Sequence, residues 1–498
     1  MHHRGLDPYR RELLKGGLAA IAAAPFVSAL QACSGRSQVT TTTGPYGYLQ
    51  PTHDLSTGLP LLQLPPGFSY RTLSWTGDPM QDGNPVPPRH DGMAVLGMQD
   101  GPDGPELILV RNHENGIGRL IQAPAQYDSV LVDRRREYGQ PGGGTTNLFV
   151  PLDPRRPVRT SPSLGGTLIN CAGGPTPWGS WLSCEETITD LTPHGGRRHG
   201  YVFEVTAEPA DTTGAPIIGM GRFKHEAAAV DPQTGIVYLT EDSHNRAGLY
   251  RYVPLDASGR QGLLALGGQL QAAKVAGVDK ADLLNPALGD EVELEWIDIP
   301  DPDADPGSYN DTYVTGTASG PFLQARAAGA LRMSRGEGIW YADGRLYIVD
   351  TSAGTDRSGR PGHGAGSVWM LDLASMRMQA IFARAAPAQG NHPDNITVSP
   401  RGGILLCEDG GGISDQFGPG NRLMGLLPSG ESYVFAKNNL LLFDRDLRRA
   451  GKRVQAGDYR SREFCGACFD PAGEILFVNV QTPGITFAIT GPWERGPL

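Results

Sequence analysis

Two short apolar runs joined by a tight turn recur along this chain, and each copy ends in acidic or amide residues. The clearest copy runs from His225 to Asp242, with the turn Asp-Pro-Gln-Thr-Gly between its two runs. The other copies span residues 90–114, 170–186, 336–350, 392–409 and 465–481. A two-strand unit of this kind cannot bury its own apolar face, so the units must gain a core by stacking against their neighbours.

Six such units predict an all-β fold, a six-bladed β-propeller, because radial stacking leaves only short, protected sheet edges. The apolar runs Leu249–Val253 and Ser367–Asp372 are expected to form outer strands. The long interval around 250–335 is interpreted as an inserted capping segment, with a helix over Leu270–Val278 and a Pro/Asp-rich stretch over Ile299–Asp305. A solenoid or a pair of β-sandwiches is the alternative architecture.

The N-terminal residues predict an export signal and not part of the fold. Arg10-Arg11 precedes a short, uncharged, Ala-rich run at 16–27 that is too short to span a bilayer comfortably. This pattern predicts a Tat signal peptide over residues 1–33, recognised by the Tat translocon, and a periplasmic or exported protein. Cys33 ends a lipobox-like Leu-Gln-Ala-Cys, so a lipid anchor on Cys33 and simple cleavage nearby both remain open.

Beyond the signal, residues 34–58 are expected to be a flexible tether and residues 59–498 a single β-propeller domain. The 68 glycines and 41 prolines indicate a turn-rich chain. The formal net charge of −10 argues against nucleic acid as a partner and suits a protein that binds cations. We expect a monomer.

The acids of the repeated units should converge on one mouth of the propeller channel, because equivalent ends of the blades meet there. The candidates are Glu114, Glu185 or Glu186, Glu226, Glu241 or Asp242, Glu337, Asp350, Asp394, Glu408 and Asp409. So many carboxylates cannot all stay ionised together without cations. Oxygen ligands in irregular geometry favour calcium.

Two further residues refine the expected chemistry of this mouth. Cys184 stands beside Glu185, and one thiolate among carboxylates favours a transition metal such as iron. Arg335 stands two residues before Glu337, and a fixed guanidinium facing a metal cluster is suited to hold a phosphate. The predicted metal ligands are Glu114, Cys184, Glu185, Glu186, Glu226, Glu337, Asp394, Glu408 and Asp409.

Several other polar residues have a structural interpretation. Asp231 and Asp470 belong to Asp-Pro turns and are expected to stabilise those turns. Cys407 lies within an apolar run and is expected to be a small core residue. Cys465 and Cys468 form a Cys-x-x-Cys pair that could close a local disulfide.

Four stretches, at residues 165–186, 224–232, 335–338 and 477–484, resemble the PhoX family of Tat-exported alkaline phosphatases. The most specific of them contains Trp178-Gly-Ser-Trp-Leu-Ser-Cys-Glu-Glu186. The resemblance extends over residues 60 to 490. It implies a six-bladed propeller with ferric iron and calcium that hydrolyses phosphate monoesters, so the expected partner is a small phosphorylated substrate. Carried over by motif, the implied cluster ligands are Cys184, Glu185 or Glu186, Glu226 and Glu337, and Arg335 would hold the phosphate.

The chain also departs from that family pattern. It is shorter, Glu241-Asp242-Ser243 replaces an Asn-rich turn, and Cys465-Gly-Ala-Cys468 stands where the last blade is expected to begin with a carboxylate. These departures indicate a divergent branch. One alternative function is a calcium propeller lactonase or esterase with a single axial calcium. Another is a non-catalytic surface-binding propeller in which calcium only ties the blades together.

Overall fold

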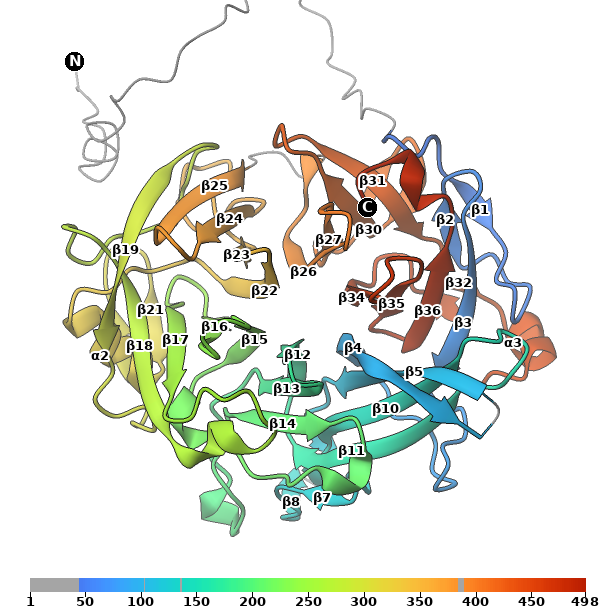
Figure 1. Ribbon diagram of the computed structural model, residues 1–498, viewed down its shortest axis with the longest axis horizontal. Helices are drawn as coiled ribbons and strands as arrows, with labels where there is room; N and C mark the ends of the chain where they lie inside the picture. Colours follow the sequence, from blue (N-terminus) through green and yellow to red (C-terminus); the bar gives the residue numbers. More distant parts are fainter. Residues whose placement is uncertain (1–43, 103, 135–136, 384–388) are drawn as a thin grey trace, which may run out of the picture.

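The computed structural model describes residues 44–102, 104–134, 137–383 and 389–498, which form a ring of sheets around a central axis (Figure 1). The strands nearest the axis are β4 (His90–Gly101), β12 (Asn170–Pro175), β15 (His225–Val230), β22 (Gly336–Ala342), β26 (Pro393–Val398) and β34 (Phe464–Phe469). Each packs against the next and β34 returns to β4, so the ring is closed. The predicted all-β propeller is confirmed. The predicted signal peptide and Cys33 lie outside the described residues.

Each inner strand begins an antiparallel meander that runs outward from the axis. From β4 the order is β5 (Gly104–His113), β10 (Gly143–Pro151) and β11 (Arg159–Thr167), with β7 (Ala125–Gln126) parallel to β11. From β12 it is β13 (Ser180–Glu185) and β14 (Val202–Thr206), and from β15 it is β16 (Val237–Glu241), β17 (Leu249–Pro254) and β18 (Gly268–Val275). From β22 it is β23 (Arg345–Asp350), β24 (Ser367–Asp372) and β25 (Arg377–Ala383). From β26 it is β27 (Ile404–Glu408), β30 (Arg422–Leu426) and β31 (Ser432–Asn438), and from β34 it is β35 (Leu476–Val480) and β36 (Ile485–Thr490).

The sheets do not separate into six independent blades. Strand β19 (Glu291–Asp298) pairs with both β18 and β25, so two neighbouring meanders join into one nine-stranded sheet. The remaining short elements are β6 (Ile117–Gly118), β8 (Val132–Arg134), β9 (Glu137–Pro141), β20 (Gly307–Asn310), β21 (Thr315–Ala318), β28 (Ile413–Asp415), β29 (Gly418–Gly420), β32 (Leu441–Leu442), β33 (Gly457–Asp458), and the helices α2 (Gly320–Ala327) and α3 (Asp444–Ala450).

The two ends of the domain are joined in the same sheets. Strand β3 (Ser69–Trp75) completes the C-terminal sheet by pairing with β36, and β1 (Gln50–Thr52) and β2 (Leu62–Leu64) extend the sheet of β31. Tyr46 is buried and packs edge-on against Phe68 and Trp493. Residues 44–58, which were expected to belong to a tether, therefore pack on the propeller: Tyr46, Leu49 and Asp54 are buried, and β1 pairs with β2.

Apolar side chains fill the spaces between neighbouring sheets. The largest core cluster contains Trp75, Phe435, Phe464, Phe487 and Trp493, all at most 1% exposed. Burying one such side chain contributes roughly 1.5–3 kcal/mol to folding. Within the described ranges, no helix is both long and apolar enough to cross a membrane.

The inserted segment differs from the expectation in one element. Residues Leu270–Val278 were expected to be helical, but Gly268–Val275 forms β18, whose backbone pairs with β17 on one side and β19 on the other. The buried residues Leu270, Ala272 and Ala273 suit a strand covered by neighbouring elements, and these strand pairings outweigh the helix propensity of alanine. The helix of the segment is α2, which begins at a Ser319 cap.

Candidate metal centre

Every inner strand carries a register irregularity near its start, after the first residue in five strands and after the second residue, Cys465, in β34. A β-bulge bends the strand and re-aims side chains, and bulges are common beside active sites. The second residue of each inner strand, which we call the bulge position, is in turn Asp91, Cys171, Glu226, Glu337, Asp394 and Cys465. Four carboxylates and two thiols therefore share one structural position around the axis.

Two further positions repeat around the mouth. The residue after each second strand is the trailing position: Glu114, Glu186, Asp242, Thr351, Asp409 and Gln481. The residue two places before each bulge position is the leading position: Arg89, Ile169, Lys224, Arg335, His392 and Glu463. In every unit the trailing N–H donates a hydrogen bond to the leading carbonyl oxygen. The same backbone geometry thus brings all three positions to one end of the channel.

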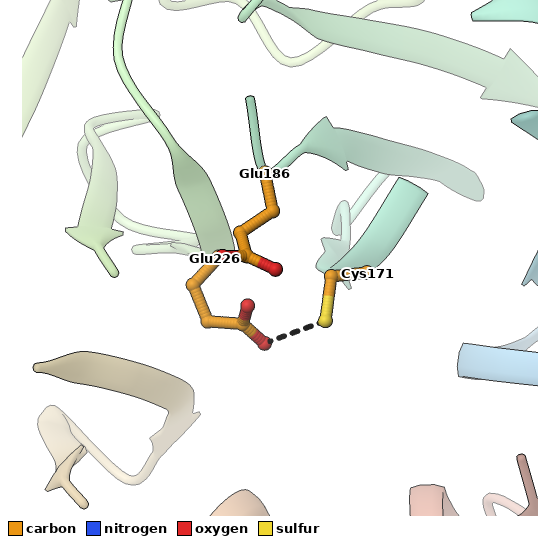
Figure 2. Close-up of side chains that lie close together, drawn as sticks. All are labelled: Cys171, Glu186 and Glu226. Atoms are coloured by element: carbon orange, nitrogen blue, oxygen red, sulfur yellow. Dashed lines mark hydrogen bonds between the residues drawn. The ribbon is translucent and has the colours of Figure 1, made fainter. Parts of the chain in front are cut away.

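The acidic and thiol side chains of these positions form four overlapping groups, within each of which the potential ligand atoms lie within 4.8 Å of one another. The groups are Cys171–Glu186–Glu226, Glu226–Glu337–Asp394, Asp394–Asp409–Glu463 and Asp91–Glu114–Glu463. Figure 2 shows the first, in which Cys171 Sγ donates to Glu226 Oε1 over 3.4 Å. Because each group shares a carboxylate with the next, neighbouring cations could be bridged by common ligands.

Burial and the charges of neighbouring carboxylates raise the pKa values of several acids in this centre. Burial, reinforced by neighbouring carboxylates, raises the pKa of both Glu186 and Asp394 to about 8. The same causes raise the pKa of Glu226 and of Glu337 well above the usual range. Burial, and then the charge of Asp91, also raises the pKa of the Cys171 thiol. These groups hold protons that a bound cation would displace.

Three leading positions supply cations to the rim of the centre. Arg335 forms ion pairs with Asp242 and Glu337, at 2.5 and 2.9 Å. Burial acts to lower the pKa of Arg335, but the charges of Glu337 and Asp242 outweigh it and raise that pKa, so the guanidinium stays charged. Lys224 lies 3.4 Å from Glu186, and Arg89 lies 3.0 Å from Glu114.

The predicted ligands that the structure brings together are Glu114, Glu186, Glu226, Glu337, Asp394 and Asp409, with Arg335 beside them. Cys184, Glu185 and Glu408 lie elsewhere. Cys184 is fully buried in an apolar cluster with Val202 and Phe223, where burial alone raises the pKa of its thiol. The thiol of the centre is Cys171.

Glu185 and Glu408 point away from the centre because each is the last residue of a second strand, one residue before a trailing position. Glu185 accepts hydrogen bonds from the backbone N–H groups of Leu168, Gly200 and Tyr201. Both carboxylate oxygens of Glu408 accept from Arg422, at 2.7 Å each. Glu241 and Asp350 occupy the same strand-end position and have local partners as well. These four acids fix loops.

Asp91, Cys171 and Glu463 belong to the centre although they were not predicted as ligands, and Asp242, named only as an alternative to Glu241, lies at its rim. Aligning the six units on the first residue of each inner strand would have revealed the bulge position. The cysteines described by the structure are free, so Cys465 and Cys468 form no disulfide. Cys465 Sγ donates to His90 O over 3.0 Å, and Cys468 lies in an apolar cluster.

The channel narrows immediately beyond the bulge positions. A Cβ atom added at Gly92 would lie 2.5 Å from Ala172 Cα, and one added at Gly338 would lie 2.8 Å from Asp394 O. A cavity of 20 Å³ remains between these inner strands, room for about one water molecule. On the mouth side, a cavity of 510 Å³ is lined by Glu186, Lys224, Asp242 and Arg335. A smaller cavity of 270 Å³ lies at the other end of β12, β15 and β22, beside Pro175, Val230 and Tyr341. The mouth is therefore the side with more space for a substrate.

The chain matches one protein family and is similar to solved structures to different degrees. The family described as alkaline phosphatase PhoX matches residues 45–484. PhoX of Pseudomonas fluorescens, solved in complex with the transition-state analogue vanadate, is 18% identical with a TM-score of 0.59, and the alignment covers 90% of this chain and 98% of that one. A gluconolactonase of Xanthomonas campestris is 12% identical with a TM-score of 0.31, covering 82% and 97%. No curated protein matches the chain.

Proposed function

The chain belongs to the alkaline phosphatase PhoX family, and from this membership we propose that the residues around its channel mouth bind metal ions and hydrolyse phosphate monoesters there. The protein is a metal-dependent phosphatase. The observation that carries the site assignment is the set of four overlapping ligand groups formed by the bulge, trailing and leading positions of neighbouring units. The natural substrate class is a small phosphorylated molecule that enters from the mouth.

The donor atoms suit two kinds of metal. Three of the four groups consist of carboxylates alone, and oxygen-only ligands favour calcium. The fourth contains the Cys171 thiol beside Glu186 and Glu226, and a mixed sulfur and oxygen set favours iron. The raised pKa values of Glu186, Glu226 and Cys171 fit this assignment, because a buried ligand without its cation holds a proton. We therefore propose calcium and iron as the cofactors.

Bound metal ions would polarise phosphoryl oxygens and activate an oxygen nucleophile. Arg335 orients the phosphoryl group. Its Nε and Nη2 donate to Asp242, and Nη2 also contacts Glu337, whereas Nη1 has no hydrogen-bond partner among the described residues. Arg335 also lines the 510 Å³ cavity, so Nη1 can donate to a phosphoryl oxygen bound there. Asp242 is a positioning residue, since it fixes the plane of this guanidinium.

The cavity contributes a second cation and excludes bulk water from one side of the substrate. Lys224 lies beside Glu186 and can neutralise negative charge that develops on the phosphoryl oxygens. The narrow, glycine-lined channel beyond the bulge positions leaves about one water in its own cavity. Substrate and product therefore exchange through the mouth.

The direct test is hydrolysis of p-nitrophenyl phosphate by the full-length protein, measured together with its iron and calcium content. We expect turnover that requires calcium, and iron that is lost in Cys171→Ser but kept in Cys184→Ala. Turnover that persists without any bound metal would overturn the assignment of the centre.

We also propose that the protein is exported through the Tat pathway as a folded, metal-loaded monomer. The support is the twin arginine at residues 10 and 11 before a short apolar run. Cys33 would then carry a lipid that anchors the mature chain at the membrane. Replacing Arg10 and Arg11 by lysine should retain the protein in the cytoplasm. Replacing Cys33 by alanine should release it in soluble form if the anchor exists.

A further inference from the structure

The cavity at the mouth extends beyond the groups assigned to the phosphoryl end of a substrate. Its volume of 510 Å³ lies in the range of roughly 300–1,000 Å³ that is typical of small-molecule pockets, so it has room for an organic group as well. Part of its wall comes from Ser243, His244 and Arg246, and part from the inserted segment, through Thr317 and Ser319. Arg246 is a third cation in this cavity, besides Lys224 and Arg335.

Arg246 is half-buried and has no carboxylate within ion-pair distance among the described residues. Its Nε donates only to Ser243 Oγ, over 3.5 Å. Its Nη1 lies beside Gly316, in the space that a Cβ atom at that residue would occupy. The guanidinium therefore lies between Ser243 and Gly316, with most of its donor capacity unused.

The other arginines beside the inserted segment provide a comparison. Arg332 pairs with Asp282 and Asp311, and Arg326 pairs with Asp282. Arg198 pairs with Asp303 and Asp305. Arg251 and Arg260 instead have neutral hydrogen-bond partners, Gln271 and Ser258. What sets Arg246 apart from these two is its place in the cavity at the mouth.

The carboxylates that share the cavity with Arg246 already have partners. Asp242 binds Arg335 and Glu186 lies beside Lys224. Glu241 accepts hydrogen bonds from Tyr250 and Ser319. None of these acids neutralises Arg246, so the unmatched positive charge in this cavity faces the space that a ligand would fill.

We propose that Arg246 forms a subsite for a second anionic group, so that the preferred substrate is a phosphate monoester whose leaving group carries a carboxylate or another phosphate. This inference rests on the proposed function. A guanidinium offers paired N–H donors that match either oxyanion, and Arg246 lines the cavity together with Thr317. Arg335 would hold the phosphoryl group and Arg246 the far end of the leaving group.

The test uses two isosteric esters that differ in charge, 3-carboxyphenyl phosphate and 3-carbamoylphenyl phosphate. We expect the metal-loaded wild-type protein to hydrolyse the carboxylate with a kcat/KM about tenfold above that of the amide. In Arg246→Gln this ratio should fall close to the ratio of the intrinsic reactivities of the two esters. A third ester with a 3-phosphonomethyl group shows which oxyanion is preferred, and preference for either over the amide supports the subsite.

Matched variants separate charge from packing. Arg246→Lys keeps the charge and should keep part of the preference, and it also serves if the glutamine variant fails to fold. Arg260→Gln removes the same charge from an exposed loop where Arg260 contacts Ser258, and its ratio should equal that of the wild type. Equal kcat/KM for both esters in an active wild-type protein would overturn the subsite but leave the phosphatase assignment intact. Hydrolysis of neither ester would overturn the proposed function, and the subsite with it.

Discussion

Glu185 and Glu186 are consecutive in the chain but serve opposite purposes. Glu185 Oε2 accepts hydrogen bonds from the backbone N–H groups of Gly200 and Tyr201, and Oε1 lies 2.6 Å from His199 Nδ1. Glu186 turns into the channel mouth, where its carboxylate joins Cys171 and Glu226 (Figure 2). The two roles differ because β13 ends between these residues: Glu185, its last residue, faces the loop before β14, and Glu186, the next residue, faces the channel axis.

This difference predicts that substituting Glu186 lowers metal content and activity, whereas substituting Glu185 lowers stability. Glu186→Gln should lower the metal content and the kcat for p-nitrophenyl phosphate while leaving the metal-free protein as stable as the wild type. Glu185→Gln should keep the metal but cost about 2 kcal/mol of unfolding free energy, because buried donors lose their acceptor. Elemental analysis and urea denaturation in the presence of a chelator measure the two effects. Equal metal loss in both variants would contradict the assignment.

Substitutions of the two cysteines in the segment 165–186 should likewise have different effects on metal content and stability. Cys171→Ser should lose iron and most of the activity, because the thiol in the ligand group disappears. Cys184→Ala should retain iron and lose about 1 kcal/mol of stability, since it removes a buried sulfur from an apolar core. Iron analysis and thermal unfolding distinguish them. If Cys184→Ala were the variant that lost iron, the centre would be misplaced.

Arg335 should affect substrate binding without affecting the metals. We expect Arg335→Gln to lower kcat/KM for p-nitrophenyl phosphate by about 100-fold, and to weaken inhibition by inorganic phosphate similarly. Arg335→Lys should recover only part of this loss, because lysine cannot pair with Asp242 through two nitrogens. Arg345→Gln, on the exposed part of β23, is the matched control. Unchanged phosphate inhibition in Arg335→Gln would refute its role.

The stability of the metal-free protein should depend on pH in an unusual direction. The pKa values of Glu186 and Asp394 are raised from 4.5 and 3.8 to about 8, so the folded chain binds protons that the unfolded chain releases. Stability is then fully present at acid pH and is lost as the pH rises from about 4 through 8. We expect the Tm in the presence of a chelator to fall between pH 5 and pH 8, and the metal-loaded protein to lack this decline. A Tm of the metal-free protein that rises over this window would contradict the raised pKa values of Glu186 and Asp394.

The propeller could be predicted from the sequence because each unit alternates two apolar runs with a turn, and such units can only be buried by stacking. The centre could be predicted only in part. Six of the nine proposed ligands converge on the mouth. Glu185 and Glu408 do not, although each is only one residue before an acid that does, Glu186 and Asp409. The apolar pattern of a sequence does not show which of two adjacent residues at a strand end points toward the axis. A β-bulge also changes the direction of side chains without changing the apolar pattern.

Cys184 illustrates a second reason why the site could be predicted from the sequence only in part. It stands beside two acids in the sequence, yet its side chain belongs to the core packed against β14, while Cys171 at the bulge position of β12 provides the thiol. The choice between two nearby cysteines depends on which one occupies the repeated bulge position. The packing of Tyr46 against Trp493, more than 400 residues away, is likewise a long-range contact that a local pattern cannot reveal.

The central claim is that the acids and the thiol at the channel mouth hold metal ions on which phosphate ester hydrolysis depends. The most direct measurement follows iron, calcium and p-nitrophenyl phosphate turnover in one preparation of the full-length protein, before chelation, after chelation and after calcium is restored. We predict iron and calcium in the active protein, loss of turnover on removal of calcium, and recovery on its return. A protein that contains neither metal, or one whose turnover is unaffected by their removal, would contradict the account.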